Sequence, residues 1–310
     1  MKIRCEDFDL ASTLDSGQVF GFKPIGNGKY EGILRGHAVC LWQEKDFLNV
    51  RALAPAPEEL IFFESEKTRR PLRSAARRLR QFSDPKKINS SGAIFSSTVQ
   101  NYFDLRRDLT PIYSIIQSDS SLEPAYKVLK GLRLIRQDPW EALACFILSS
   151  NNNVKRIMGI HENLVNYFCA EERGFPSSAQ IARSHENILR QLGLGYRAPF
   201  LLKTATFLSH NPGYLENLRD MEFEEAKNRV LCFPGIGPKV ADCVLLYGFH
   251  RLEAFPVDVW IARVVRHLYF KRRKIPEDKI RAFGMKRWGA NAGYVQQYLF
   301  HAARTGILAL

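Results

Sequence analysis

The first 55 residues alternate between apolar and polar side chains and are interrupted by glycines. The alternation is clearest over residues 30–42, and Gly26-Asn27-Gly28 supplies the residue types that a tight hairpin turn requires. A period of two residues is typical of strands with one buried face. The pattern therefore predicts a small twisted antiparallel sheet at the start of the chain.

The middle of the chain has a helical period instead. Apolar residues recur at helical spacing over residues 154–170, 185–192, 198–209 and 223–232. We therefore expect an α+β fold, in which a twisted antiparallel sheet is followed by all-helical domains. The predicted boundary separates an N-terminal α+β domain, residues 1–125, from a helical region, residues 126–310, that holds the functional cleft.

One helix start in this region is especially clear. Asp138 has the properties of an N-cap, Pro139 suits the first helical position, and Glu141 completes the pattern of a capping box. The apolar run over residues 142–148 that follows predicts a central core helix.

Residues 65–92 differ in composition from their surroundings. Between Lys67 and Lys87 there are nine basic residues and one acidic residue, Asp84. Arg73, Arg77 and Arg80 are spaced so that a basic amphipathic helix could form. A solvated face or a loop is the usual meaning of such a segment. We interpret residues 65–92 as an insertion that attracts DNA without sequence preference.

The charge of the whole chain favours a polyanionic partner. The 310 residues carry a formal net charge of +13, and the isoelectric point is about 9.5. Nucleic acid is the first expectation and an acidic membrane surface the second. We expect no membrane span, because no apolar run reaches about 18 residues. The N-terminus has no apolar signal core, so we expect an intracellular protein, nuclear in a eukaryote and cytoplasmic or nucleoid-bound in a prokaryote.

The cysteines predict reduced thiols. They stand at positions 5, 40, 145, 169, 232 and 243, without a Cys-x-x-Cys pair. Such a scatter is typical of a reducing compartment. It also argues against a zinc site and against a cysteine-ligated iron–sulfur cluster. We therefore expect no metal held by side chains.

The strongest local motif is the glycine turn within residues 231–243, Leu-Cys-Phe-Pro-Gly-Ile-Gly-Pro-Lys-Val-Ala-Asp-Cys. Gly235 and Gly237 allow a tight turn between two helices and a close approach of the backbone to an external group. Exposed N–H groups at such a turn and at a helix start bind phosphate well. The layout is that of a helix-hairpin-helix, although an ordinary turn between helices explains the glycines equally well.

Two polar side chains near this turn could carry chemistry. Lys239 and Cys243 are four residues apart and share one helix face. Asp258 follows Pro256 and precedes an apolar helix, so it has the pattern of an N-cap. An amine and a carboxylate can also act as a catalytic pair, in which the deprotonated amine attacks an electrophilic carbon. A solvated lysine and a simple cap remain the structural alternatives.

These residues resemble those of a known family. Pro-Gly-Ile-Gly-Pro-Lys-Val-Ala-Asp-Cys and the later Pro-Val-Asp-Val resemble the helix-hairpin-helix DNA glycosylases, and are most similar to the 8-oxoguanine DNA glycosylases. The resemblance implies that Lys239 is the nucleophile at the sugar C1′ atom and that Asp258 is its essential carboxylate. Two departures stand out. Trp260 occupies a position where the family often has histidine near a phosphate, and Pro238 removes one backbone N–H.

The same resemblance implies a pocket for the damaged base. Gly17, within Ser-Gly-Gln, would offer its carbonyl to the N7–H group that 8-oxoguanine has and guanine lacks. Gln296 and Phe300 are four residues apart on the last predicted helix. Gln296 would bind the Watson–Crick edge, and Phe300 would hold the base against Cys243. Taken alone, a turn glycine, a core phenylalanine and a surface glutamine would be the ordinary interpretations.

A further group would contact the cytosine left behind when the base is flipped out. The resemblance assigns Asn151 and Arg156, after the run of three asparagines, to this cytosine. Tyr196 lies between two glycines and an arginine, where an aromatic ring can enter a base stack. Arg197 would then bind the cytosine edge. The asparagines could instead simply end a helix. Tyr196 could instead pack on the next helix.

We therefore expect a bifunctional 8-oxoguanine glycosylase and apurinic/apyrimidinic lyase. It would act as a monomer on double-stranded DNA that contains 8-oxoguanine opposite cytosine. No cofactor is expected beyond a monovalent cation at the hairpin carbonyls. The alternatives are an alkylated-base glycosylase on the same fold, which needs no hairpin lysine, and a helix-hairpin-helix module that only binds DNA.

Overall fold

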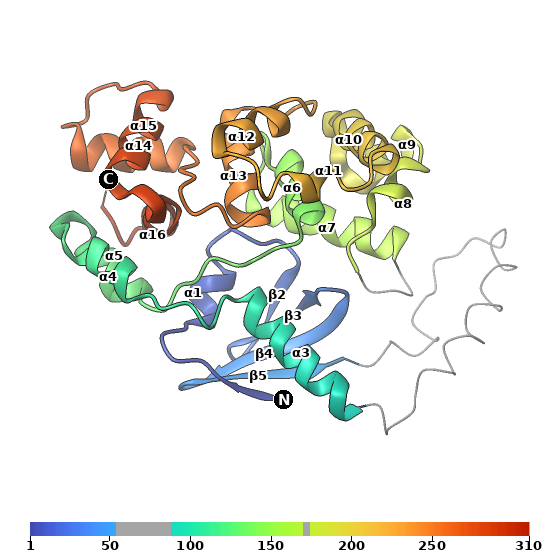
Figure 1. Ribbon diagram of the computed structural model, residues 1–310, viewed down its shortest axis with the longest axis horizontal. Coiled ribbons are helices and arrows are strands. Elements are labelled where there is room, and N and C mark those ends of the chain that lie inside the picture. Colours follow the sequence, from blue (N-terminus) through green and yellow to red (C-terminus); the bar gives the residue numbers. More distant parts are fainter. Residues whose placement is uncertain (54–87, 170–173, 310) are drawn as a thin grey trace, which may run out of the picture.

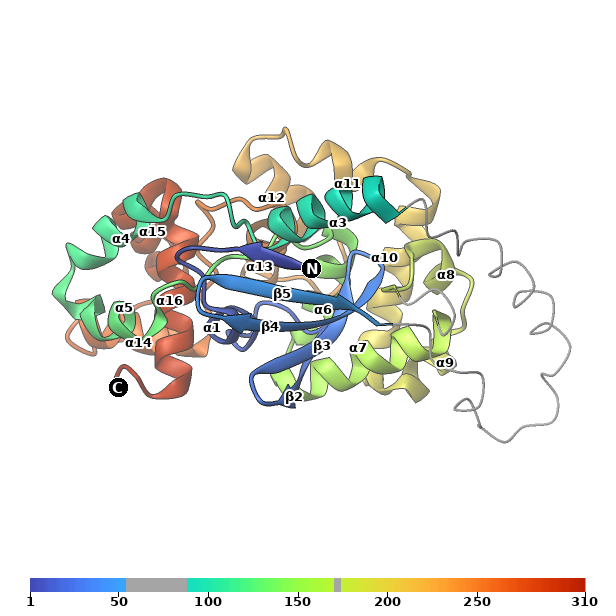
Figure 2. The same ribbon diagram turned by 90° about the horizontal axis from the view of Figure 1, so that it is seen from below.

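The computed structural model describes residues 1–53, 88–169 and 174–309 (Figures 1 and 2). Most of the predicted insertion at residues 65–92, including the expected basic helix with Arg73, Arg77 and Arg80, lies outside the described residues.

The N-terminal part contains the predicted antiparallel sheet. Its five strands are ordered β1-β5-β4-β3-β2, and every neighbouring pair is antiparallel. The strands are β1 (Lys2–Arg4), β2 (Phe22–Gly26), β3 (Lys29–Leu34), β4 (His37–Glu44) and β5 (Phe47–Ala52). The turn between β2 and β3 is the predicted one, and Gly26, Asn27 and Gly28 all have positive φ angles. Apolar residues of the sheet pack with those of α1 (Leu10–Leu14) and α3 (Ile88–Tyr102) in one core.

The described residues that follow α3 are mainly helical and form two groups, which stand side by side above the sheet in Figure 1. One group comprises α4 (Thr110–Gln117), α5 (Glu123–Leu129), α14 (Val259–Tyr269), α15 (Glu277–Trp288) and α16 (Ala292–Thr305). The other comprises α6 (Pro139–Ser149), α7 (Val154–Phe168), α8 (Ser178–Ala182), α9 (Glu186–Leu189), α10 (Ala198–His210), α11 (Tyr214–Asn217), α12 (Phe223–Leu231) and α13 (Pro238–Gly248). A single apolar core runs through both groups. The predicted α+β fold is thus confirmed.

The start of α6 matches its prediction in part. The Asp138 carboxylate accepts hydrogen bonds from the N–H groups of Trp140 at 2.9 Å and Glu141 at 3.1 Å, as an N-cap does. The predicted capping box is wrong in its second half. The Glu141 carboxylate instead lies 3.0 Å from Nε2 of His161, a buried residue of α7 that local sequence does not reveal.

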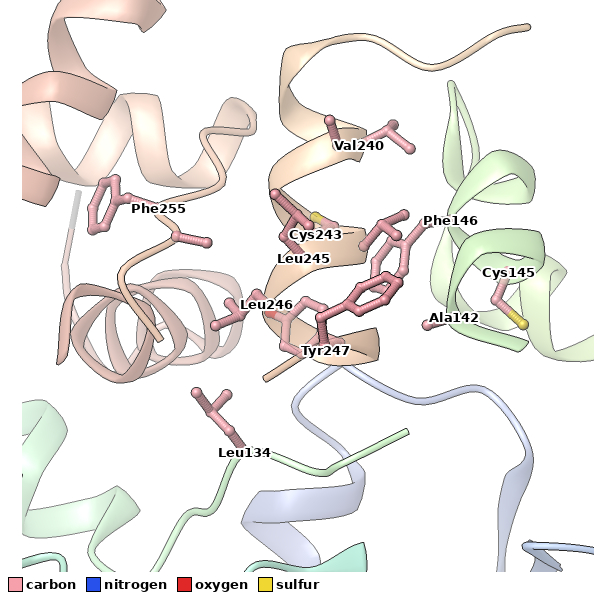
Figure 3. Packing of buried hydrophobic residues seen from close by; sticks show 14 of the residues in the cluster. Leu134, Ala142, Cys145, Phe146, Val240, Cys243, Leu245, Leu246, Tyr247 and Phe255 are labelled. Atoms are coloured by element: carbon pink, nitrogen blue, oxygen red, sulfur yellow. The ribbon is translucent and has the colours of Figure 1, made fainter. Parts of the chain in front are cut away.

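Helices α6 and α13 pack closely and place the glycine turn. Figure 3 shows Phe146 of α6 beside Tyr247 of α13, with Cys243 one turn earlier on α13. Gly248 permits the close approach, because a Cβ atom there would lie 3.1 Å from the Ala142 side chain. The inner part of α13 is buried throughout, whereas its first turn reaches the cleft between the helix groups.

Candidate active site

The glycine turn joins α12 to α13, and its two glycines serve different purposes. Gly235 has a φ angle of +78°, and a Cβ atom there would lie only 2.4 Å from the Phe200 ring. Gly237 is the N-cap of α13 in extended conformation, and nothing lies within 4 Å of where its Cβ would project. Gly235 is therefore needed for the turn itself, whereas Gly237 leaves open space in front of the helix N-terminus, where an anion is favoured.

Lys239 is in the first turn of α13 and is half-buried. Its amine lies 5.8 Å from the centroid of the Phe146 ring, and both Lys239 and Cys243 line the same small cavity. Burial raises the pKa of the Cys243 thiol to about 11, although the neighbouring Lys239 charge opposes that shift. Cys243 is therefore a neutral thiol at physiological pH and does not compete with the lysine as a nucleophile.

Asp258 lies across from Lys239 and caps α14. Its carboxylate accepts a hydrogen bond from the N–H group of Ile261 at 2.8 Å, which agrees with the predicted N-cap. Burial raises the pKa of Asp258, while the Ile261 N–H and the positive charge of Lys239 oppose the rise. The carboxylate is thus partly desolvated and lines the same cavity as the amine, the environment in which a carboxylate can influence a reaction.

A cavity of about 50 Å³ brings together the six residues that the sequence assigned to catalysis and to the base pocket, together with three others. It is lined by Gly17, Phe146, Lys239, Cys243, Tyr247, Pro256, Asp258, Gln296 and Phe300. These residues come from the N-terminal part of the chain, from α6, from α13, from the segment before α14, and from α16. Only the folded chain assembles them.

The polar groups of the cavity are arranged for recognition. Gln296 is buried and donates a hydrogen bond from Nε2 to the carbonyl of Pro256 at 3.2 Å. Its Oε1 atom is buried without a hydrogen-bond partner among the described residues. Gly17 has a φ angle of +79°, and a Cβ there would lie 3.3 Å from the Phe300 ring. An unpaired buried acceptor is costly, so it indicates a missing donor such as a base N–H.

Phe146, Tyr247 and Pro256 were not predicted for this cavity. Phe146 stands in an apolar run that is typical of core, and its ring stacks on Tyr247 at a centroid separation of 5.3 Å. Tyr247 had a usable signal, since it continues the four-residue spacing of Lys239 and Cys243 along one face of α13.

A larger cleft, of about 880 Å³, adjoins the small cavity. Lys239 and Asp258 line both, so the amine and the carboxylate lie where the cavity meets the cleft. The cleft is also lined by residues 149–152, by the start of α13, by Val259 and by the first turns of α15. It is large enough for part of an extended polymer to lie in it.

Of the residues predicted to contact the estranged cytosine, Asn151 lines this cleft, and Tyr196 and Arg197 are hydrogen-bonded to Ser150, which also lines it. Tyr196 is 49% exposed, and its hydroxyl donates to the carbonyl of Ser150 at 3.1 Å. Arg197 is only 2% exposed and donates from Nε to Ser150 at 2.9 Å and from Nη2 to the carbonyl of Asn151 at 2.8 Å. The guanidinium also stacks on Tyr196 at 4.3 Å. In this conformation Arg197 holds the asparagine turn and is turned away from solvent.

Asn151 and Arg156 are both exposed. Asn151 has a φ angle of +48°, a left-handed conformation that asparagine tolerates. Trp260 is half-buried, and the Arg263 guanidinium lies 5.3 Å from its ring centroid. The Arg263 guanidinium thus places a positive charge beside Trp260, the position where the family often has histidine.

Within residues 1–53, 88–169 and 174–309, no group of three or more histidine, cysteine or acidic side chains could hold a metal ion. In the same residues no helix is both long and apolar enough to span a bilayer.

Comparison with known proteins agrees with the geometry. Residues 1–143 match the family described as 8-oxoguanine DNA glycosylase, N-terminal domain, and residues 144–290 match the HhH-GPD superfamily of base excision DNA repair proteins. The chain belongs to the 8-oxoguanine DNA glycosylases. The resemblance seen in the sequence around Lys239 is thereby confirmed.

Individual relatives of this 8-oxoguanine DNA glycosylase cover most of the chain. A probable N-glycosylase/DNA lyase of Methanothermobacter thermautotrophicus is 34% identical over 68% of this chain and 75% of that protein. The N-glycosylase/DNA lyase of Saccharomyces cerevisiae is 31% identical over 65% of each chain. Clostridium acetobutylicum 8-oxoguanine glycosylase/lyase, solved with DNA containing cytosine opposite 8-oxoguanine, has a TM-score of 0.79 and 26% identity, with coverage of 99% of this chain and 98% of that one.

Proposed function

We propose that the chain is a bifunctional DNA glycosylase and apurinic/apyrimidinic lyase that removes 8-oxoguanine opposite cytosine. The supporting observation is the cavity in which the Lys239 amine and the Asp258 carboxylate lie beside Gly17, Gln296 and Phe300. The lyase arm is what the names of the archaeal and yeast relatives describe.

The damaged nucleotide must leave the duplex, because a half-buried lysine cannot reach C1′ inside the stack. Glycosylases are the general case of such base flipping. In our proposal the base enters between Cys243 and Phe300. A cavity of about 50 Å³ holds only a few water molecules, so it must enlarge as a purine enters. Phe300 is half-buried whereas Cys243 is buried, so we expect the Phe300 ring to move as the base enters.

Recognition of the lesion rests on two polar groups. The Gly17 carbonyl accepts from N7–H of 8-oxoguanine and repels the N7 lone pair of guanine. The unpartnered Oε1 of Gln296 accepts from an N–H group of the Watson–Crick edge. Because a buried polar group left without a partner is costly, contacts of this kind discriminate more strongly than shape alone.

The chemistry follows from the amine and the carboxylate. The neutral amine of Lys239 forms a bond to C1′ as the glycosidic bond breaks, and the bonding electron pair leaves with the base, which takes up a proton. Asp258 stabilises the positive charge that develops on the sugar. Ring opening yields a Schiff base, and loss of a C2′ proton then expels the 3′-phosphate. The Cys243 thiol lines the same cavity, and because burial raises its pKa to about 11 it stays protonated and does not compete with the amine for C1′.

The opposite strand is bound by Asn151, which lines the larger cleft, together with Arg156, Tyr196 and Arg197. Tyr196 enters the space that the flipped base leaves, while Asn151 and Arg156 contact the cytosine. For Arg197 to join them, its guanidinium must exchange the carbonyls of Ser150 and Asn151 for a base edge. Gly235 and Gly237 place the N-terminus of α13 against a phosphate.

Several finer points belong to the same proposal. The 232–237 turn offers carbonyl oxygens and no acidic side chain to balance a double charge, and backbone carbonyls are ligands that a monovalent cation accepts. We also propose that the protein is a monomer and that its domain boundary lies near residue 125. We further propose that it acts in the compartment that contains the DNA, the nucleus in a eukaryote or the nucleoid in a prokaryote.

The proposal is tested by measuring release of free base from duplexes with 8-oxoguanine opposite each of the four bases, and from a duplex with an alkylated purine. Preferential release from the 8-oxoguanine:cytosine duplex, lost in Lys239→Gln, is the expected result. Release of the alkylated base alone, unaffected by Lys239→Gln, would indicate the alkylated-base enzyme. Tight binding without any release would indicate a non-catalytic DNA-binding protein.

A further inference from the structure

Gln297 follows the pocket residue Gln296 on α16 but points elsewhere. It is 0% exposed, and both ends of its amide are engaged. Its Nε2 group donates to the main-chain carbonyl of Ser16 at 2.9 Å, and its Oε1 atom accepts a hydrogen bond of 2.5 Å from the Tyr247 hydroxyl. Gln297 does not line the small cavity. One of its partners, Tyr247, does line it, and the other, Ser16, directly precedes the lining residue Gly17.

The bond to Ser16 controls the neighbouring glycine. The carbonyl of Ser16 and the N–H of Gly17 belong to one planar peptide unit. Holding that carbonyl therefore fixes the plane from which Gly17 continues and limits the direction of the Gly17 carbonyl. Gly17 has a φ angle of +79° and no side chain, so the backbone itself offers little restraint.

The bond to Tyr247 connects the same amide to the nucleophile. Tyr247 lies two turns after Lys239 on α13 and stacks on Phe146 (Figure 3). One buried amide thus joins the loop that carries Gly17 to the helix that carries Lys239. Through it, the carbonyl and the amine are held at a set separation.

The rest of this loop is fixed from the other side. The buried Gln18 amide donates from Nε2 to the carbonyl of Thr13 at 3.0 Å and to that of Arg133 at 2.9 Å, and its Oε1 accepts from the N–H of Ile135 at 2.8 Å. Arg304 of α16 donates to the carbonyl of Asp15. The loop is therefore anchored before and after Gly17. Gln297 holds the carbonyl of the residue that directly precedes the glycine, and Gln137 holds the carbonyl of Gln18, which follows it, at 2.6 Å.

We propose that Gln297 is a positioning residue for lesion recognition, which sets the Gly17 carbonyl at the distance from Lys239 that an oxidised guanine requires. This inference rests on the proposed function, because it takes the Gly17 carbonyl to be the group that faces the base. Gln297 is needed for the base to dock correctly, and it is not needed for the amine to react with a sugar that has already lost its base.

Gln297→Met tests the proposal, since methionine has a similar length and forms neither hydrogen bond. Tyr298→Phe is the matched control, because it changes the next buried residue of α16 at a hydroxyl that has no hydrogen-bond partner among the described residues. Two rates are measured for each protein under single turnover. One is release of 8-oxoguanine from its duplex with cytosine, and the other is borohydride trapping on a duplex with a preformed abasic site.

We expect Gln297→Met to lower base release by about 100-fold, the scale of a 1 Å misplacement, and to leave abasic-site trapping within about threefold of wild type. Tyr298→Phe should match wild type in both. Equal losses in both rates would overturn the proposal, because the residue would then serve only folding. Unchanged base release would overturn it as well. If the wild-type protein released no 8-oxoguanine, the proposed function itself would be wrong and this inference would fall with it.

Discussion

Asp258 has two roles that two substitutions can separate. Its carboxylate caps α14 through the 2.8 Å bond from the N–H of Ile261, and in our proposal it also stabilises charge on the sugar. Asp258→Asn keeps an oxygen that can accept the capping bond but removes the charge. Asp258→Ala removes both. Comparison of the two variants therefore shows whether stability and activity depend on the capping oxygen or on the negative charge of Asp258.

The structure predicts that the two variants differ in stability but share a loss of activity. Loss of the cap in Asp258→Ala should lower the free energy of unfolding by about 1 kcal/mol. Asparagine caps about as well as aspartate, and the charge that it removes contributes only about 0.3–1 kcal/mol at a helix N-terminus. Burial raises the pKa of Asp258, so the folded protein binds this proton more tightly than the unfolded chain does. The stability contribution of Asp258 is therefore full below the unfolded pKa and is lost as the pH rises through the folded pKa.

At neutral pH the ionised carboxylate thus opposes folding, and Asp258→Asn removes that cost. The unfolding free energy of Asp258→Asn should lie within about 0.5 kcal/mol of wild type, or above it. Both variants should lose at least about 100-fold in the single-turnover rate of base release. Urea unfolding at pH 7 and base release from the lesion duplex are the assays. Equal destabilisation of the two variants, or near-wild-type activity in Asp258→Asn, would refute the reasoning.

Three further predictions concern the surroundings of the site. Cys243→Leu should fill the cavity of about 50 Å³, abolishing release of 8-oxoguanine while borohydride trapping on a preformed abasic site persists. Gly235→Ala should lower the unfolding free energy by more than about 1 kcal/mol, because φ is +78° and the Phe200 ring would lie 2.4 Å from the added Cβ. Gly237 has open space around it, so Gly237→Ala should leave stability nearly unchanged. It should instead weaken DNA binding, measured in a filter or anisotropy assay. Asp242→Asn should lower the unfolding free energy by about 3–5 kcal/mol in urea, because it leaves a buried lysine without the carboxylate that lies 2.8 Å from its amine.

Local sequence signals predicted the features that depend on neighbours in the chain. The hairpin at Gly26-Asn27-Gly28, the cap at Asp138 and the cap at Asp258 each require only a few adjacent residues, and the structure has all three. The Lys239–Cys243 contact follows from one helix face. The family resemblance supplied the more distant members of the cavity, since no periodicity connects Gly17 with Gln296.

What the sequence did not reveal depends on groups that meet only after folding. The Glu141 carboxylate pairs with His161 and so does not complete the capping box. Arg197 has the pattern of an exposed arginine at a glycine turn, yet its guanidinium is buried against the carbonyls of Ser150 and Asn151. Gln297 contacts a carbonyl 281 positions away, and a glutamine on an apolar helix gives no sign of such a partner.

The central claim is that the Lys239 amine bonds to deoxyribose. Its most direct test is to incubate the protein with an 8-oxoguanine:cytosine duplex and borohydride, and to locate the trapped bond by digestion and mass spectrometry. We expect a covalent protein–DNA adduct on Lys239 that is absent from Lys239→Gln. Base release without an adduct, or an adduct on a different residue, would contradict it.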